Sequence, residues 1–78
     1  MTKGEYRVGV TFNPSSNPVV DAIKRQAADL IDLIATIGKE AVSFEHRHEI
    51  LRLKALAQTA IEEGAMWAVK AATKGPMT

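Results

Sequence analysis

Two stretches with helical spacing, separated by a short connection, constrain the fold of this chain more than any other feature. Apolar residues recur at intervals of three and four from residue 20 to residue 37, and again from residue 50 to residue 71. Between these stretches, Gly38 is a natural end for one helix, and the Ser43 hydroxyl can cap the next. Two long helices joined by so few residues lie antiparallel, so the sequence predicts an all-α helical hairpin.

Caps and prolines place the ends of these helices. Asn17 is a good N-cap and Pro18 suits the first helical position, so the first helix is expected over about residues 18–37. The second helix is expected over about residues 44–74, because a Gly-Pro pair follows that stretch.

The first 17 residues follow a different pattern. Tyr6, Val8, Val10 and Phe12 alternate with other residues, and this period of two predicts a short extended arm or strand over residues 1–17. A lone strand has no sheet partner, so the arm is expected to lie against the helices or another subunit. The chain shows no internal repeat or low-complexity segment, and residues 1–78 are expected to form one domain.

Chain length points to self-association. The 78 residues are 46% hydrophobic and 5% aromatic, and so short a chain cannot bury a large core. Several apolar residues also lie off the expected helix faces, namely Ala22, Leu33, Leu51, Met66 and Val69. Because exposed apolar surface at helical spacing marks association, a homo-oligomer is predicted, with its pockets between subunits.

Charge and residue usage exclude several classes of function. A formal net charge of +1 argues against salt-driven binding to a DNA or RNA polymer, which requires a basic face. The chain has no cysteine, which rules out disulfides and thiolate metal sites and fits a reducing cytosol. Asp29 and Asp32 interrupt the most apolar run, and the first residues lack a signal-peptide pattern, so no association with a membrane is expected.

The motifs of common enzymes are also missing, and neither catalysis nor a cofactor is expected. His46 and His48 lie two positions apart on a helix and therefore point about 200° from each other, too divergent for one metal ion. Glu62 and Glu63 diverge by about 100° and are interpreted as surface charges or as ion-pair partners in an assembly.

Small residues dominate one face of the second helix. This face consists of Leu53, Ala57, Ala60, Gly64, Trp67 and Ala71. Gly64 costs roughly 1 kcal/mol relative to alanine in a helix interior, so another backbone is expected to pass close to it. Packing within the hairpin core is the simplest explanation.

Two groups of residues are candidates for binding a ligand. Phe12 places an aromatic ring before a polar loop, and Lys24 follows early in the next helix, where a cation is unfavourable unless an anion occupies that helix end. Alternatively, Phe12 only fastens the arm to the hairpin, and Lys24 pairs with Asp21 or Asp29.

The second group is Arg52 and Thr59, which lie seven residues apart on another face of the second helix. This pair can hold a ligand if a symmetry-related copy supplies further contacts. A solvated helix face is the alternative interpretation.

Two segments resemble one known family. They are Thr11-Phe12-Asn13-Pro14-Ser15, leading to Ile23-Lys24, and the block Leu56 to Ala68, in which Thr59, Glu62, Met66, Trp67 and Ala68 carry the strongest likeness. Together these segments resemble the phage anti-CBASS sponge family and the related hairpin domain of phage anti-Thoeris sponges. The likeness covers most of the chain from Phe12 to Thr73.

The resemblance implies a non-catalytic protein, in the cytoplasm of an infected bacterium, that binds cyclic oligonucleotide signals of host immunity and withholds them from their effector. Family members are similar in forming compact hexamers of helical hairpins, with cyclic dinucleotides such as cyclic GMP-AMP bound between protomers. Some members also bind cyclic trinucleotides at a separate three-fold site.

Site residues are carried over by position. Phe12 looks like the aromatic residue that stacks on a base, Lys24 looks like the cation that meets a phosphate, and Asn13 can hydrogen-bond a base edge or ribose. The better-known branch has a tyrosine and a histidine in place of Phe12-Asn13 and a longer loop before the lysine. Phenylalanine can still stack on a base, but it lacks the hydroxyl group through which tyrosine can form a hydrogen bond.

For the three-fold site, Arg52 and Thr59 look like the lining pair, with Lys54 as the substitute for Arg52.

The alternative function for the whole chain is a small helical adaptor whose apolar stripe docks a protein partner.

Overall fold

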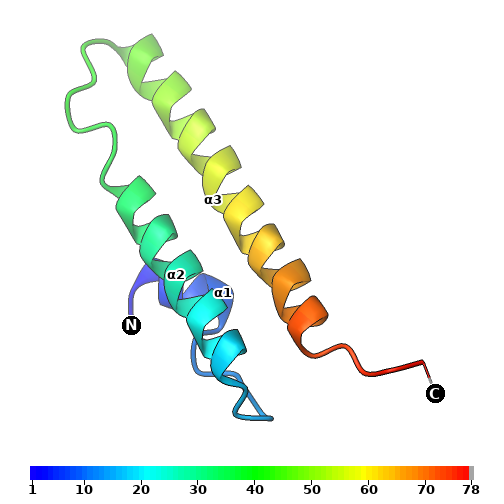
Figure 1. Cartoon of the computed structure of the whole chain (residues 1–78). Helices are drawn as coiled ribbons and strands as arrows, with labels where there is room; N and C mark the ends of the chain where they lie inside the picture. Colours follow the sequence, from blue (N-terminus) through cyan, green and yellow to red (C-terminus); the bar gives the residue numbers. More distant parts are fainter. Residues whose placement is uncertain (78) are drawn as a thin grey trace.

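A computed structural model describes residues 1–77 and contains three helices in that range, α1 (Lys3–Val8), α2 (Pro18–Ala35) and α3 (Phe44–Ala72). Helices α2 and α3 run antiparallel beside each other, and the loop between them forms one end of the molecule (Figure 1). The predicted helical hairpin is confirmed.

Side chains near the helix ends explain where the two long helices begin and stop. The Asn17 side-chain oxygen accepts hydrogen bonds from the N–H groups of Val19 and Val20, and Pro18 occupies the first turn. Each helix is followed by a threonine, and the hydroxyl groups of Thr36 and Thr73 donate to carbonyls of the preceding turn at 2.7 and 2.8 Å. Both helices therefore end two residues before the predicted limits.

The N-terminal segment differs from its prediction, because it forms the helix α1 and residues 1–77 contain no strand. Thr2 and Glu5 form a capping box, in which the Thr2 hydroxyl accepts from the Glu5 N–H at 3.1 Å and the Glu5 carboxylate accepts from the Thr2 N–H at 2.8 Å. Gly9, with φ at 66°, ends the helix in the left-handed conformation. The Thr-x-x-Glu cap thus prevails over the alternating pattern that predicted an extended arm.

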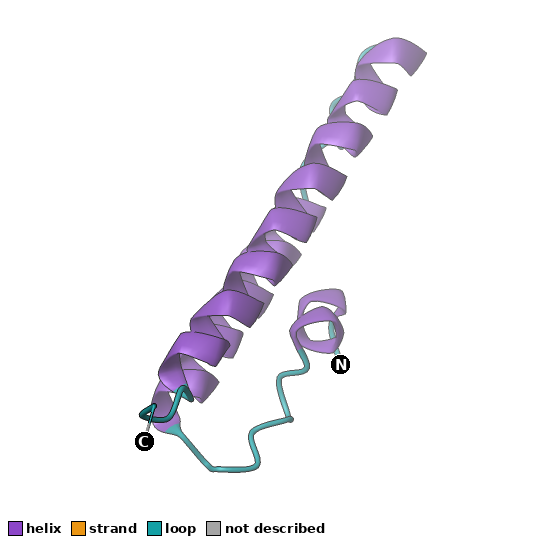
Figure 2. Cartoon of the chain, turned by 90° about the vertical axis from the view of Figure 1, so that its right-hand side faces the viewer, coloured by secondary structure: helices purple, strands orange, loops and turns teal. Residues whose placement is uncertain are grey.

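Helix α1 lies against one face of the hairpin (Figure 2). A Cβ atom at Gly4 would lie only 2.1 Å from the Ala28 carbonyl oxygen, so only glycine allows this approach of the two backbones. The Gly4 N–H also donates to the Asp32 carboxylate at 2.7 Å.

An ion pair between Glu5 and Arg25, at 2.8 Å, adds to this docking. A hydrogen bond from the Thr2 N–H and the Arg25 guanidinium lower the pKa of Glu5 from 4.5 to about 2. A lowered carboxyl pKa means that this stabilisation is complete above pH 4.5 and is lost as the pH falls towards 2.

The buried core is small and partly polar. Its apolar members are Val20, Ala27, Ala28, Ile31 and Ala65. Gln58 is buried beside them and joins all three helices, because its amide nitrogen donates to the Ile31 carbonyl and its oxygen accepts from the Lys3 amine, each at 3.0 Å. A buried side-chain amide is stable only with such partners.

The small-residue face of α3 points outward, contrary to the prediction that it packs in the hairpin core. Trp67 and Leu53 are more than half exposed. No atom outside the helix's own backbone lies within 4 Å of a Cβ built at Gly64. The buried residues of α3 are Gln58 and Ala65, which lie under α1 and α2 on a different face.

The chain is also long and thin, with extents of 56 × 25 × 13 Å and a radius of gyration of 15.3 Å. A compact domain of this length would have a radius of gyration of about 11.5 Å. In the part of the chain that the structure describes, no helix combines the length and apolar character that a bilayer span requires.

Replacing Gly4 with alanine is expected to detach α1, because the new Cβ would collide with backbone atoms that cannot move aside. Overpacking of this kind typically costs about 1–3 kcal/mol, and urea unfolding followed by circular dichroism measures the loss. Gly75→Ala is the matched control, since a Cβ there meets nothing within 4 Å. Equal stability of the two variants would contradict the proposed role of the Gly4 contact.

Candidate ligand-binding site

Phe12 and Lys24 come together where the chain enters α2. The Lys24 ammonium lies 5.4 Å from the centroid of the Phe12 ring. The ring itself is 71% exposed, whereas Lys24 is only 7% exposed. An exposed aromatic face beside a cation is a surface on which a flat ligand can stack.

Lys24 holds the loop that carries Phe12. Its ammonium donates to the Gly9 carbonyl at 3.0 Å and to the Phe12 carbonyl. It makes no ion pair with Asp21 or Asp29, so that alternative is wrong for the described chain. The amine instead satisfies carbonyls at the end of α1 and in the loop, as burial of an ammonium requires.

Asn13 organises the same loop. Its amide nitrogen donates to the Asn17 carbonyl at 2.7 Å and to the Asp21 carboxylate at 2.9 Å, and its oxygen accepts from the Asn17 N–H at 3.1 Å. These bonds fix the loop just before the N-cap of α2. Both donors of the Asn13 amide are therefore used, one within the loop and one on α2, and its oxygen retains one acceptor position.

A hollow of about 260 Å³ lies beside Phe12. Phe12, Asn13 and Ser15 line it from the loop, Lys24 from α2, Val69 from α3, and Thr73 from the residue after α3. Segments from both ends of the sequence thus form one shallow pocket, open to solvent.

A second, larger cleft of about 430 Å³ lies between α1 and α3. Arg7 enters it from α1, and its Nε donates to the Glu62 carboxylate at 2.6 Å. Arg7 was missed from the sequence because the segment was assigned to an extended arm. The cleft and the Phe12 hollow share Lys24 and Val69, so they adjoin.

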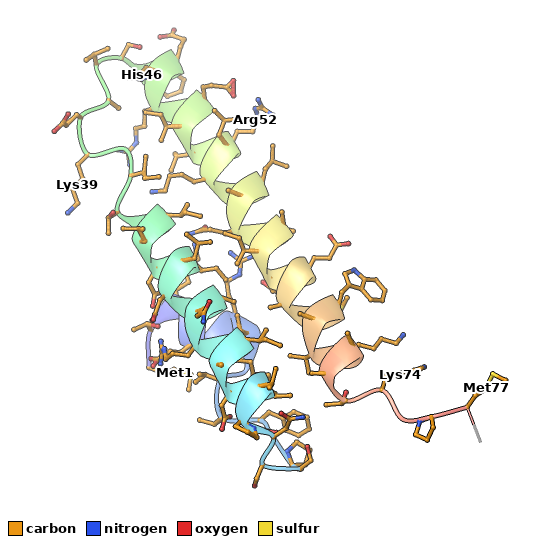
Figure 3. The ribbon with its side chains drawn as sticks, in the orientation of Figure 1. Met1, Lys39, His46, Arg52, Lys74 and Met77 are labelled. Atoms are coloured by element: carbon orange, nitrogen blue, oxygen red, sulfur yellow. The ribbon has the colours of Figure 1, made fainter. Side chains whose placement is uncertain are left out.

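The structure does not bring Arg52 and Thr59 together within one chain. Seven residues of helix separate them by about 10 Å along the axis. Figure 3 shows Arg52 near the loop end of α3, on the side turned away from α2. Its guanidinium pairs with Glu49 at 2.6 Å, and this hydrogen bond raises the pKa of Arg52 above its usual value.

Lys54, the substitute for Arg52, has a structural role in this chain. Its ammonium donates to the carbonyls of Ala35 and Ile37 at 3.0 and 2.6 Å, where α2 ends. A cation at a helix C-terminus is favourable, and these bonds satisfy carbonyls without helical partners.

The two histidines also have local partners. His46 accepts a hydrogen bond from the Val42 N–H through Nδ1 at 3.1 Å, and the ring centroids of His48 and Phe44 lie 4.0 Å apart. Residues 1–77 contain no group of three or more potential side-chain ligands placed to hold a metal ion.

Replacing Lys24 with methionine is expected to destabilise the fold by about 1–3 kcal/mol, because the Gly9 and Phe12 carbonyls lose a buried donor. Chemical unfolding measures this loss. Lys39→Met, a change of an exposed lysine in the α2–α3 loop, is the control and should stay within about 0.5 kcal/mol of the parent. A Lys24 variant as stable as this control would show that the two hydrogen bonds contribute nothing.

Comparison with known proteins places the chain in a family. A family model described as Acb2/Tad1, hairpin domain, matches residues 4–73. No curated protein and no solved structure gives a significant match. The matched range contains α2, α3 and all of α1 except Lys3, together with the residues that line both hollows, and it confirms the resemblance inferred from the sequence. The chain therefore belongs to the Acb2/Tad1 hairpin-domain family, a family of sponge-type binding domains.

Proposed function

We propose that this protein binds cyclic oligonucleotide second messengers of bacterial antiphage defence and sequesters them, without cleavage, in the cytoplasm of the infected host. Family membership supports the class of ligand. The observation that carries the proposal is the exposed Phe12 ring, held beside the buried Lys24 ammonium by a hydrogen-bonded loop.

In this proposal, Phe12 stacks on one base of a cyclic dinucleotide such as cyclic GMP-AMP. An ammonium group has three N–H donors, and Lys24 uses two of them on carbonyls. The third donor is available for a phosphate oxygen of the ligand. The remaining acceptor position of Asn13 can take a hydrogen bond from a base amino group.

We propose that the protein acts as a homo-oligomer, with a hexamer as the expected state and with ligands bound between copies. Its thin shape leaves many large apolar side chains in water, among them Leu30, Leu33, Leu53, Leu56 and Trp67. Burying them between copies would supply the stability that the small core lacks.

Arg52 and Thr59 form the second proposed site, which takes cyclic trinucleotides. Because the two side chains are far apart along α3, each ligand at this site would contact Arg52 from one copy and Thr59 from another. The alternative function is a helical adaptor, and it is favoured only by the exposed leucines of α3, which fit a partner's apolar groove.

A ligand panel tests the proposed function. Cyclic dinucleotides and trinucleotides are expected to raise the melting temperature, whereas linear dinucleotides and adenosine monophosphate leave it unchanged. Ligand at one hundred times its dissociation constant should add about 2.7 kcal/mol to stability. Heating should then release the ligand intact. A chain that responds to no cyclic ligand would exclude the sponge function and favour the adaptor.

Replacing Phe12 with alanine is expected to weaken binding of the preferred cyclic dinucleotide by about 1–3 kcal/mol, the usual contribution of one stacked base. Isothermal titration calorimetry measures the change. Phe44→Ala is the matched control, because Phe44 is 70% exposed, close to the 71% of Phe12, but lies at the other end of the hairpin. Equal affinities of the two variants would remove Phe12 from the site.

A further inference from the structure

We propose that Arg7 and Thr59 form an anion subsite in the cleft between α1 and α3, which accepts a phosphodiester group of the bound messenger. The proposal rests on the proposed function and adds a residue from α1 to the ligand contacts. It begins with the position of Arg7, whose Nη2 lies 3.4 Å from the Thr59 hydroxyl while its Nε donates to Glu62.

Hydrogen-bond capacity shows what this pair offers a ligand. A guanidinium has five N–H donors, and Arg7 uses one on Glu62 and one on Thr59, so three remain. Because the Thr59 oxygen accepts from Arg7, the hydroxyl hydrogen of Thr59 can point to another acceptor. Arg7 and Thr59 therefore present donors side by side, which is the arrangement that a phosphate oxygen accepts.

Glu62 positions the guanidinium. The Arg7 side chain is only 21% exposed, and the bond to Glu62 fixes its orientation at the cleft wall. A flexible arginine would lose conformational entropy on binding a ligand, whereas this one is already ordered.

The charges that face the cleft balance one another. Arg7 and Lys24 are cationic, and Glu62 and Glu63 are anionic. Such a cleft does not attract a polyanion at long range, so it selects a ligand through directed hydrogen bonds to a single charged group. A phosphodiester carries one negative charge and meets this requirement.

The cleft is also placed to share a ligand with the Phe12 hollow. The two spaces meet at Lys24 and Val69 and measure about 430 and 260 Å³. A molecule whose base stacks on Phe12 can therefore extend past Lys24 and set a phosphate against Arg7. Met66 and Val8 supply an apolar wall for the intervening sugar.

Calorimetry with cyclic GMP-AMP and a cyclic triadenylate tests the subsite. Arg7→Ala is expected to raise the dissociation constant of whichever of these ligands binds the parent chain by at least tenfold. Arg47→Ala, which removes the same charge near the loop end of α3, should change affinity less than twofold. An Arg7 variant with parental affinity would overturn the proposal.

Glu62→Gln separates ligand contact from structural support. Both Arg7→Ala and Glu62→Gln break the ion pair between α1 and α3. If Arg7 binds phosphate, Glu62→Gln keeps or tightens the affinity, because the glutamine oxygen can still accept from the Arg7 Nε–H and hold the guanidinium, while a competing negative charge is gone. If the pair only holds α1 in place, both variants weaken binding to the same extent, and the subsite is rejected.

A probe without nucleotide distinguishes failure of the subsite from failure of the proposed function. The Nε–H NMR signal of Arg7 in the parent chain is expected to shift on titration with inorganic phosphate, with no such shift for Arg52. If phosphate shifts the signal but the chain binds no cyclic nucleotide, the anion subsite is supported and the proposal that the protein binds a cyclic messenger is rejected. If neither phosphate nor a cyclic nucleotide moves the signal, the subsite is excluded.

Discussion

The buried ammonium of Lys24 is the interaction on which the rest of the structure depends. It joins the end of α1 to the loop that carries Phe12, and it lies on the wall between the two hollows. Burying an ammonium without partners is strongly unfavourable, so the loop must keep its carbonyls directed at this group. A single residue thereby couples the docking of α1 to the presentation of the aromatic ring.

Several contacts of α1 with the hairpin are specific, and most of these are hydrogen bonds or ion pairs. The Gly4 backbone packs on Ala28, Lys3 donates to Gln58, and Arg7 pairs with Glu62. Polar contacts of this kind add little net stability, but they permit few alternative arrangements, because a shift of α1 would break directed hydrogen bonds and leave the buried Gln58 side chain without its partner. With so few apolar residues buried, positional precision in this chain comes from hydrogen bonds and from one close contact of two backbones.

The hairpin was predictable because its signals are local. Asn17 before Pro18 and the cap at Ser43 are each readable within a few residues of sequence, and Phe12 and Lys24 lie on either side of the same helix start. The nature of α1 is also encoded locally, in the capping box of Thr2 and Glu5, whereas the alternation of apolar residues over the same segment predicts an extended arm. The ion pair of Arg7 with Glu62 could not be predicted from the sequence, since the two residues lie 55 positions apart and meet only once α1 is docked.

The face of α3 that packs in the core could not be identified from periodicity, because apolar residues surround much of that helix. The inward face is the one that carries Gln58, whose buried side chain is hydrogen-bonded to Ile31 of α2 and to Lys3 of α1. This packing leaves Gly64 and Trp67 in water on a chain only 13 Å thick in its smallest dimension. The hollow beside Phe12 is lined by α2 and α3 together with the loop, so the packing of α2 on α3 determines both this hollow and the exposed apolar face of α3. In the proposed oligomer, the packing that fixes the ligand contacts is therefore also the packing that leaves a surface for other copies of the chain.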